Sequence, residues 1–297
     1  MMDRRSFLQV LGGTALLTMT PPALRRRLVA AQGATDLASL GLPELTVTLT
    51  DAGYQVSPDT TPAGWTLVTF VNHQSAGDNS ADIMALPPGE TAESIFGSMA
   101  TAVAGGPVPD WAFESTLVGA PWAPAGASAR GVGLLTAGDW VVFNGGAPYE
   151  PIPLTVTEAA ATPAAAPALT ADAEVTFQEF AFLGLDKPVP AGPRIWKVTN
   201  TGQQPHLMNV NKLPDGTTPS QFMNGLMGMM TGTPAADAIP PDSIQNVGGC
   251  ATISTGQSLY LALDLAAGTY GALCFFPDRQ TGAPHVMLGM AQVFTVG

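Results

Sequence analysis

One loop near the end of the sequence carries three side chains that bind soft metal ions. Cys274 is followed by His285 after ten intervening residues and by Met290 after four more. A second imidazole, His206, lies upstream in a strand-like stretch. A thiolate, two imidazoles and a thioether form the donor set of a trigonal copper site, with the cysteine and histidines in one plane and a weak methionine on the axis. We therefore predict that His206, Cys274, His285 and Met290 hold one type 1 copper ion.

Residues 273–290 resemble the C-terminal ligand loop of the cupredoxins, the blue-copper family that includes plastocyanin, azurin, halocyanin and the nitrite reductases. That loop runs Cys, a variable gap, His, four residues and Met, usually with a glycine such as Gly289 before the methionine. The Cys-to-His gap here is at the long end. Residues 200–206 are similar to the Asn-rich turn that precedes the first histidine of the family. The resemblance implies an electron carrier whose loop histidine, His285, points outward beside Pro284 and passes electrons to a partner.

Three alternatives remain open. Zinc accepts cysteine and histidine, although a thioether is a poor zinc ligand. Cys250 could instead form a disulfide with Cys274 in an exported chain, which would leave a metal-free sandwich acting as an interaction module. A methionine cluster could hold cuprous ion in a copper carrier or storage protein, although methionine also fills cores; its members are Met223, Met227, Met229 and Met230.

The sequence predicts that the segments around these side chains form short strands. Apolar residues alternate with polar ones over residues 44–50, which is the period of a half-buried strand, and leucine recurs at every second position over 259–265. With 33 Gly and 27 Pro, the composition favours turns between strands over long helices. Landmarks of the first half return in the same order about 128 residues later, including a helical segment at 91–104 and another at 219–230.

We therefore predict an all-β fold of two tandem Greek-key β-sandwich domains, which the resemblance makes cupredoxin-like, each with a short helical insert. The domains span residues 40–158 and 172–297, joined by an Ala/Pro-rich linker at 159–171. Alignment of the copies places Asn144 at the position of Cys274, and Asp78 or Asn79 at that of His206. The first copy thus reads as metal-free, and only the second carries the ligand set.

Residues 1–31 read as a targeting signal. Asp3-Arg4-Arg5-Ser6-Phe7-Leu8 resembles the twin-arginine export motif and precedes an apolar run too short to span a bilayer comfortably, and the alternative is an uncleaved membrane anchor. We expect export to the periplasm or the extracellular space, with no stable membrane span in the mature chain. Without these residues, six basic and 22 acidic residues remain, a formal charge of −16. This charge argues against nucleic acid and favours a redox partner with a basic surface.

The histidine count bears on catalysis. The sequence contains three histidines, and His73 reads as a surface turn residue. Multicopper oxidases and copper nitrite reductases, which also stack cupredoxin domains, use many more histidines for their catalytic coppers. No nucleophile elbow, phosphate-binding loop or HExxH motif is present. We therefore predict no catalytic residues and no enzyme activity.

Overall fold

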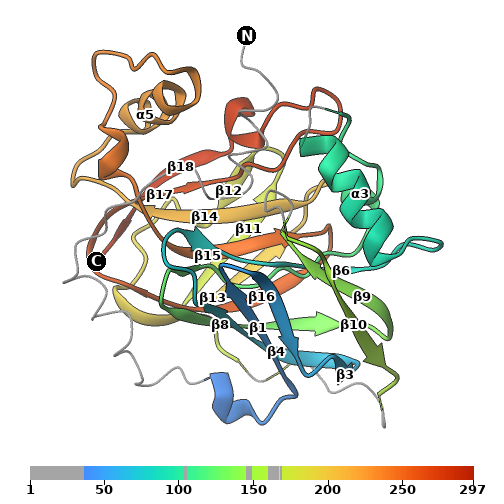
Figure 1. The fold of residues 1–297 in the computed structure, drawn as a ribbon. Helices are drawn as coiled ribbons and strands as arrows, with labels where there is room; N and C mark the ends of the chain where they lie inside the picture. The colour runs from blue at the N-terminus through green and yellow to red at the C-terminus, as the bar shows by residue number, and fades with distance from the viewer. Residues whose placement is uncertain (1–36, 104–105, 145–148, 160–166, 168) are drawn as a thin grey trace.

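The computed structural model describes residues 37–103, 106–144, 149–159, 167 and 169–297. Strands dominate the fold, and short helical segments lie at its periphery (Figure 1). The strands of the first half are β1 (Glu44–Thr50), β2 (Gly53–Ser57), β3 (Thr60–Pro62), β4 (Gly64–Asn72), β5 (Asp78–Asn79), β6 (Asp82–Ala85), β7 (Ala123–Pro124), β8 (Ser128–Leu135), β9 (Gly138–Phe143) and β10 (Ile152–Thr157).

The second half repeats this pattern. Its strands are β11 (Ala173–Gln178), β12 (Ala181–Leu183), β13 (Gly192–Asn200), β14 (His206–Lys212), β15 (Gln245–Ile253), β16 (Ser258–Leu265), β17 (Gly268–Leu273) and β18 (Ala291–Val296). The helical segments are η1 (Leu37–Leu40), α3 (Ala92–Val103), α4 (Trp111–Glu114), α5 (Pro219–Thr231), η2 (Pro241–Ser243) and η3 (His285–Leu288).

One eight-stranded sheet runs through both halves in the order β12-β11-β13-β16-β8-β4-β1-β2. The halves meet at its centre, where β16 pairs antiparallel with β8. Two four-stranded sheets, β3-β10-β9-β6 and β15-β14-β17-β18, complete the two sandwiches. In both halves the first strand lies parallel to its neighbour, β1 to β4 and β11 to β13, so the repeat in the sequence corresponds to a repeat in topology.

Each half has its own core between its two sheets. Buried side chains of β11, β13 and β16 pack against those of β14, β15, β17 and β18, and β1, β4 and β8 pack in the same way against β6, β9 and β10. In β16 the buried Leu259, Leu261, Leu263 and Leu265 recur at every second position, because successive side chains of a strand point to opposite faces. The alternation in the sequence therefore identifies the face of β16 that packs into the core of the second half.

A second junction fixes the halves against each other beside the predicted ligands. The backbone N–H of Ala251 donates to the carbonyl of Ala120, and that of Trp122 donates to Gly249. The Thr252 N–H donates to the Asp82 carboxylate at 2.9 Å. The first half thus packs directly on β15, next to the strand that begins with His206.

The all-β prediction is confirmed, and the predicted helical inserts correspond to α3 and α5. Helix α5 begins with a capping box between Thr218 and Gln221. It tolerates the buried Gly225 because a Cβ there would lie 2.8 Å from Ile239 Cγ1, so the glycine permits close packing. The signal at 1–31 and most of the linker at 159–171 lie outside the described residues. Among the described helices, none combines the length and apolar composition that a membrane span requires.

Candidate metal centre

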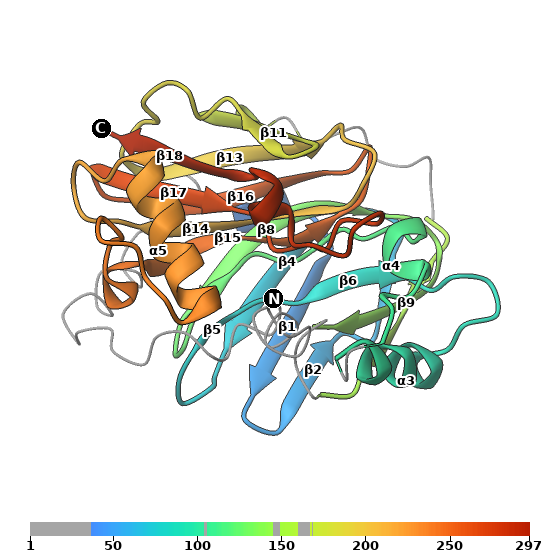
Figure 2. The ribbon, with the colours of Figure 1, turned by 90° about the horizontal axis from the view of Figure 1, so that it is seen from above.

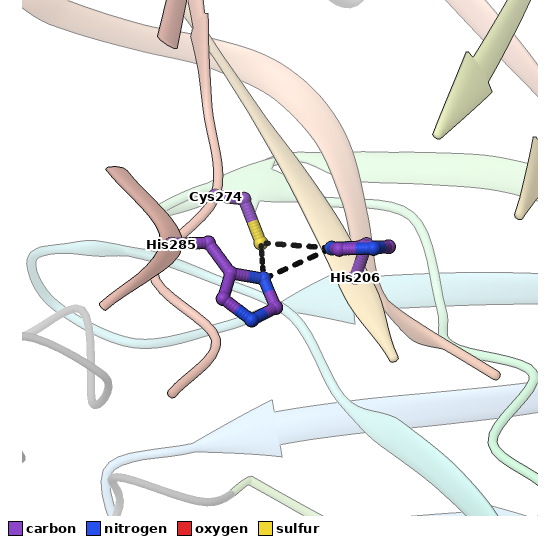
Figure 3. A group of neighbouring side chains, drawn as sticks. All are labelled: His206, Cys274 and His285. Carbon is purple, nitrogen blue, oxygen red and sulfur yellow. Dashed lines mark hydrogen bonds between the residues drawn. The ribbon is translucent and has the colours of Figure 1, made fainter. Parts of the chain in front are cut away.

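Three of the four predicted ligands meet in the second half. His206 is the first residue of β14, Cys274 follows the last residue of β17, and His285 opens η3 on the loop beyond. Figure 3 shows Cys274 Sγ and the two imidazoles directed at one point. Their donor atoms all lie within 4.8 Å of one another, and all three side chains are completely buried. The architecture therefore brings a soft sulfur and two imidazole nitrogens into one dry pocket.

The spacing of these donors fits a single small metal ion. Nδ1 of His206 lies 2.9 Å from Nδ1 of His285. Cys274 Sγ lies 4.0 Å from the first nitrogen and 3.6 Å from the second. A metal bound at about 2.0 Å to nitrogen and about 2.3 Å to sulfur separates neighbouring donors by roughly 3 to 4 Å. The residues present thus fit such an ion without rearrangement of the strands.

Burial keeps both histidines neutral at physiological pH, as metal ligation requires. Desolvation lowers the pKa of His206 to about 4, although the Glu179 carboxylate opposes the shift. Desolvation and, to a smaller extent, the adjacent His206 lower the pKa of His285 to about 3, against the opposing charges of Asp278 and Glu179. Neutral imidazole is the form that offers a lone pair to a metal.

The thiol of Cys274 is protonated in the absence of a metal, because burial raises its pKa to about 12. Two backbone N–H groups oppose this effect: that of Leu207 donates to Sγ at 3.4 Å, and that of Phe276 also lowers the pKa. These donors stabilise negative charge on sulfur, so they favour the thiolate once a cation replaces the proton.

A carboxylate orients His206 from its far side. Oε1 of Glu179 lies 3.6 Å from Nε2 of His206, and the backbone N–H groups of Gln203 and Gln204 donate to the same carboxylate. A carboxylate at Nε2 favours the tautomer that carries its proton there, which leaves the Nδ1 lone pair facing Cys274. Gly202 makes this approach possible, because a Cβ there would lie 2.7 Å from Glu179 Oε1 and 2.9 Å from His206 Nε2.

Met290, the predicted axial ligand, lies beside the group. It is completely buried and belongs to the same hydrophobic cluster as Cys274. The Cys274 N–H donates to its carbonyl, and its own N–H donates to the carbonyl of His285. These bonds hold the methionine backbone next to the donors, while its role as a ligand stays a prediction.

The expectation that His285 points outward is wrong. Its side chain is completely buried beneath aromatic rings, with Phe180 at 5.0 Å and Phe276 at 5.8 Å between ring centroids. The first half supplies a further layer, because Phe113 of α4 packs edge-on against Phe276 at 5.6 Å. Arg279 of the ligand loop also pairs with Glu114 of α4. Figure 2 shows α4 beside the tip of this loop, so the fold covers the face where the histidine was expected to emerge.

The other sequence candidates lie apart from this group. Cys250 and Cys274 are both free thiols, so the disulfide alternative is wrong. Cys250 is buried in β15, where burial raises its pKa to about 12. His73 is exposed, as predicted. The methionines of α5 are partly buried, and Met223 and Met229 pack on the hydrophobic cluster that joins α5 to Val286.

The equivalent position in the first half contains a polar pair. Nδ2 of Asn144 donates to Oδ1 of Asn79 at 2.7 Å, and Nδ2 of Asn79 donates to Gln74. These asparagines occupy the places that the alignment of the copies assigned to Cys274 and His206. Buried amides joined by hydrogen bonds satisfy one another, and their weak donor set does not favour a soft metal.

Two features of the site could not be found from the sequence. Glu179 is one of 23 acidic residues and is distant in the chain from its partner His206. The aromatic cover from Phe113 depends on the packing of one half on the other. Glu179 directly follows β11, and no local pattern in the sequence marks it as a partner of His206.

No family model and no curated protein matches the sequence. The structure aligns with that of a sodium dithionite-reduced auracyanin from the photosynthetic bacterium Roseiflexus castenholzii, at 22% identity over 42% of this chain and 94% of that chain, with a TM-score of 0.28. Auracyanin A, a "blue" copper protein from Chloroflexus aurantiacus, aligns at 19% identity over 42% and 99% of the two chains, with a TM-score of 0.26.

A multi-copper oxidase from Pediococcus acidilactici aligns at 10% identity over 86% of this chain and 59% of that chain, with a TM-score of 0.23. The assignment of the site rests on its own geometry. The two-sheet topology and the buried His-Cys-His group make this an all-β double sandwich with one candidate metal centre in the described part of the chain.

Proposed function

We propose that this protein binds one copper ion through His206, Cys274 and His285, with Met290 as a weak axial ligand, and acts as an exported one-electron carrier. The observation that carries the proposal is the convergence of two neutral imidazole nitrogens and one sulfur in a completely buried pocket. Two histidines and a cysteine in a trigonal group beside a methionine favour a blue-copper centre over zinc, for which a thioether is a poor ligand.

Bound copper would supply a single-electron redox couple. The protein would hold the donors on two neighbouring strands and one short loop, exclude water with Phe180 and Phe276, and orient His206 through Glu179. Fixed donors in a dry pocket limit rearrangement when the charge of the ion changes, which suits electron transfer more than substrate chemistry.

A non-catalytic role is part of the proposal. Three histidines, two of them in this group, leave too few nitrogen donors for a further catalytic copper cluster. Export by the twin-arginine route to the periplasm or the extracellular space rests on the motif at Arg4 and Arg5. A partner with a basic surface is proposed from the formal charge of −16 that remains without residues 1–31.

The test is a cupric titration of the purified protein followed by visible absorption. We expect an intense red-region band that saturates at one copper per chain and bleaches reversibly on reduction. Cys274→Ser should abolish the band, whereas the matched Cys250→Ser should retain it, because Cys250 lies outside the donor group. A colourless protein would overturn the proposal. Binding of several cuprous ions without a band would favour the alternative of a carrier or storage protein that uses the methionines of α5.

A further inference from the structure

The turn between β11 and β12 connects both imidazoles of the metal centre to the surface. Its two residues are Glu179 and Phe180. The Glu179 carboxylate lies 3.6 Å from Nε2 of His206, and its side chain is 30% exposed. The Phe180 ring packs on His285 at 5.0 Å between ring centroids and is only partly buried. Two consecutive residues thus contact the two histidines, one each, and both reach solvent.

Other contacts of the imidazoles lead into the protein. The rings of Phe177 and Phe276 also lie against the histidines, and both are buried. Phe276 is covered in turn by Phe113 of α4, and Arg279 of the ligand loop pairs with Glu114 of the same helix. The turn at 179–180 therefore lies at the surface, whereas the face where the loop histidine was expected to emerge is covered by α4.

The repeat shows which residue of the turn is specific to the half that carries the donors. In the first half the corresponding turn, between β1 and β2, consists of Asp51 and Ala52. Asp51 accepts a backbone N–H from the chain beyond β4, just as Glu179 accepts the N–H of Gln203, so the carboxylate belongs to the shared fold. Ala52, however, stands where the second half has Phe180. The turn forms without an aromatic ring, so the ring has a purpose other than support of the turn.

We propose that Phe180 is the contact through which the metal centre exchanges electrons, and that it docks a redox protein with a positively charged surface. This inference rests on the proposed function. A partly exposed aromatic ring is an apolar anchor of the kind that dominates the energetics of protein interfaces. The adjacent Glu179 carboxylate places negative charge at the rim, which favours a cationic partner and speeds their encounter. Because His285 is buried, the partner meets the ring and not the ligand itself.

Cytochrome c, a basic haem protein, is a suitable probe in stopped-flow experiments at about 10 mM ionic strength, where charges are weakly screened. Reduced cytochrome c loses one electron, the cupric ion of the loaded full chain takes it up and becomes cuprous, and no bond forms or breaks. Phe180→Leu keeps an apolar side chain over His285 and should retain the red absorption band. It should slow the reaction about fivefold or more, as loss of an aromatic interface anchor does.

Leu288→Ala is the matched control, because Leu288 is an exposed apolar residue of η3 on the ligand loop itself. It should leave the rate unchanged. Gln203→Lys adds a positive charge next to Glu179 and should slow the reaction roughly twofold. Ser75→Lys adds the same charge at the corresponding place in the first half, where the Ser75 N–H donates to Asp51, and should have little effect.

A second measurement uses the metal-free chain. Titration of the full, ¹⁵N-labelled chain with reduced cytochrome c should shift the amide resonances of Glu179, Phe180 and Gln203 and leave those of Asp51 and Ala52 in place. Phe180→Leu should weaken these shifts, because the anchor is lost while the charge of the turn is kept.

An unchanged rate in Phe180→Leu, or slowing in Leu288→Ala instead, would overturn the role of Phe180. Amide shifts spread equally over both turns would show charge attraction only and would overturn the docking surface. A chain that forms no red band fails the proposed function. A chain that forms the band but reacts at a rate independent of Phe180 fails this inference alone.

Discussion

Replacement of Gly202 by alanine tests how the chain orients His206. The new Cβ would lie 2.7 Å from Glu179 Oε1 and 2.9 Å from His206 Nε2, against an ordinary contact of at least 3.4 Å. Both contacts are too short, so ordinary van der Waals distances require a shift of about 0.7 Å relative to the carboxylate and about 0.5 Å relative to the imidazole. His206 is completely buried, whereas the Glu179 side chain is 30% exposed, so the carboxylate gives way first.

Loss of the carboxylate from Nε2 removes the group that favours the metal-binding tautomer of His206. Removal of such a partner typically lowers metal affinity about 10- to 100-fold, or roughly 1.4 to 2.7 kcal/mol. We expect this loss in Gly202→Ala, measured by competition for copper with a chromophoric chelator. Glu179→Gln should show a similar loss, and the double variant little more, because both substitutions break one interaction.

Gly97→Ala is the matched control, since Gly97 lies in α3 and a Cβ added there would have no neighbouring atom within 4 Å. It should leave copper affinity unchanged. Unaltered affinity in Gly202→Ala, or fully additive effects of the Gly202 and Glu179 substitutions, would refute the reasoning that Glu179 acts through His206.

Three further outcomes follow from the structure. Asn200→Ala should lower the free energy of unfolding by about 1 to 3 kcal/mol in denaturant titrations, because the buried Asn200 amide donates to the Gln204 and Ile253 carbonyls. Asn72→Ala should lower the free energy of unfolding by a similar amount in the first half without weakening copper binding. Phe113→Ala should speed reduction of the bound copper by a small external reductant in stopped-flow experiments, because it opens the aromatic cover; an unchanged rate would show that α4 does not limit access. The free energy of unfolding of the metal-free protein should fall as the pH falls from about 6.5 towards 4, because the two histidines take up protons in the unfolded chain but stay neutral when His206 and His285 are buried in the folded one. In His285→Gln the free energy of unfolding should change less steeply with pH.

The sequence predicted the features that local patterns encode. Alternation located strands such as β16, and the spacing of Cys274, His285 and Met290 on one loop marked the candidate site. The structure also brings His206, which lies outside that loop, together with Cys274 and His285, while their binding of a metal stays a prediction. These predictions succeed because strand periodicity and loop spacing depend on neighbours in the chain.

Features that depend on distant contacts could not be predicted. His285 was expected at the surface because Pro284 and the family resemblance both favoured it, yet Phe180 and α4 cover it from other parts of the chain. The sheet shared through β8 and β16 likewise has no signature in either strand alone. Tertiary packing, not local propensity, decides both outcomes.

The most direct test of the central claim is a crystal structure of the copper-loaded protein with anomalous scattering at the copper edge. We predict one anomalous peak between Nδ1 of His206, Nδ1 of His285 and Sγ of Cys274, with the Met290 thioether on its axis. A peak among the methionines of α5, or none at the histidine and cysteine donors, would contradict the account.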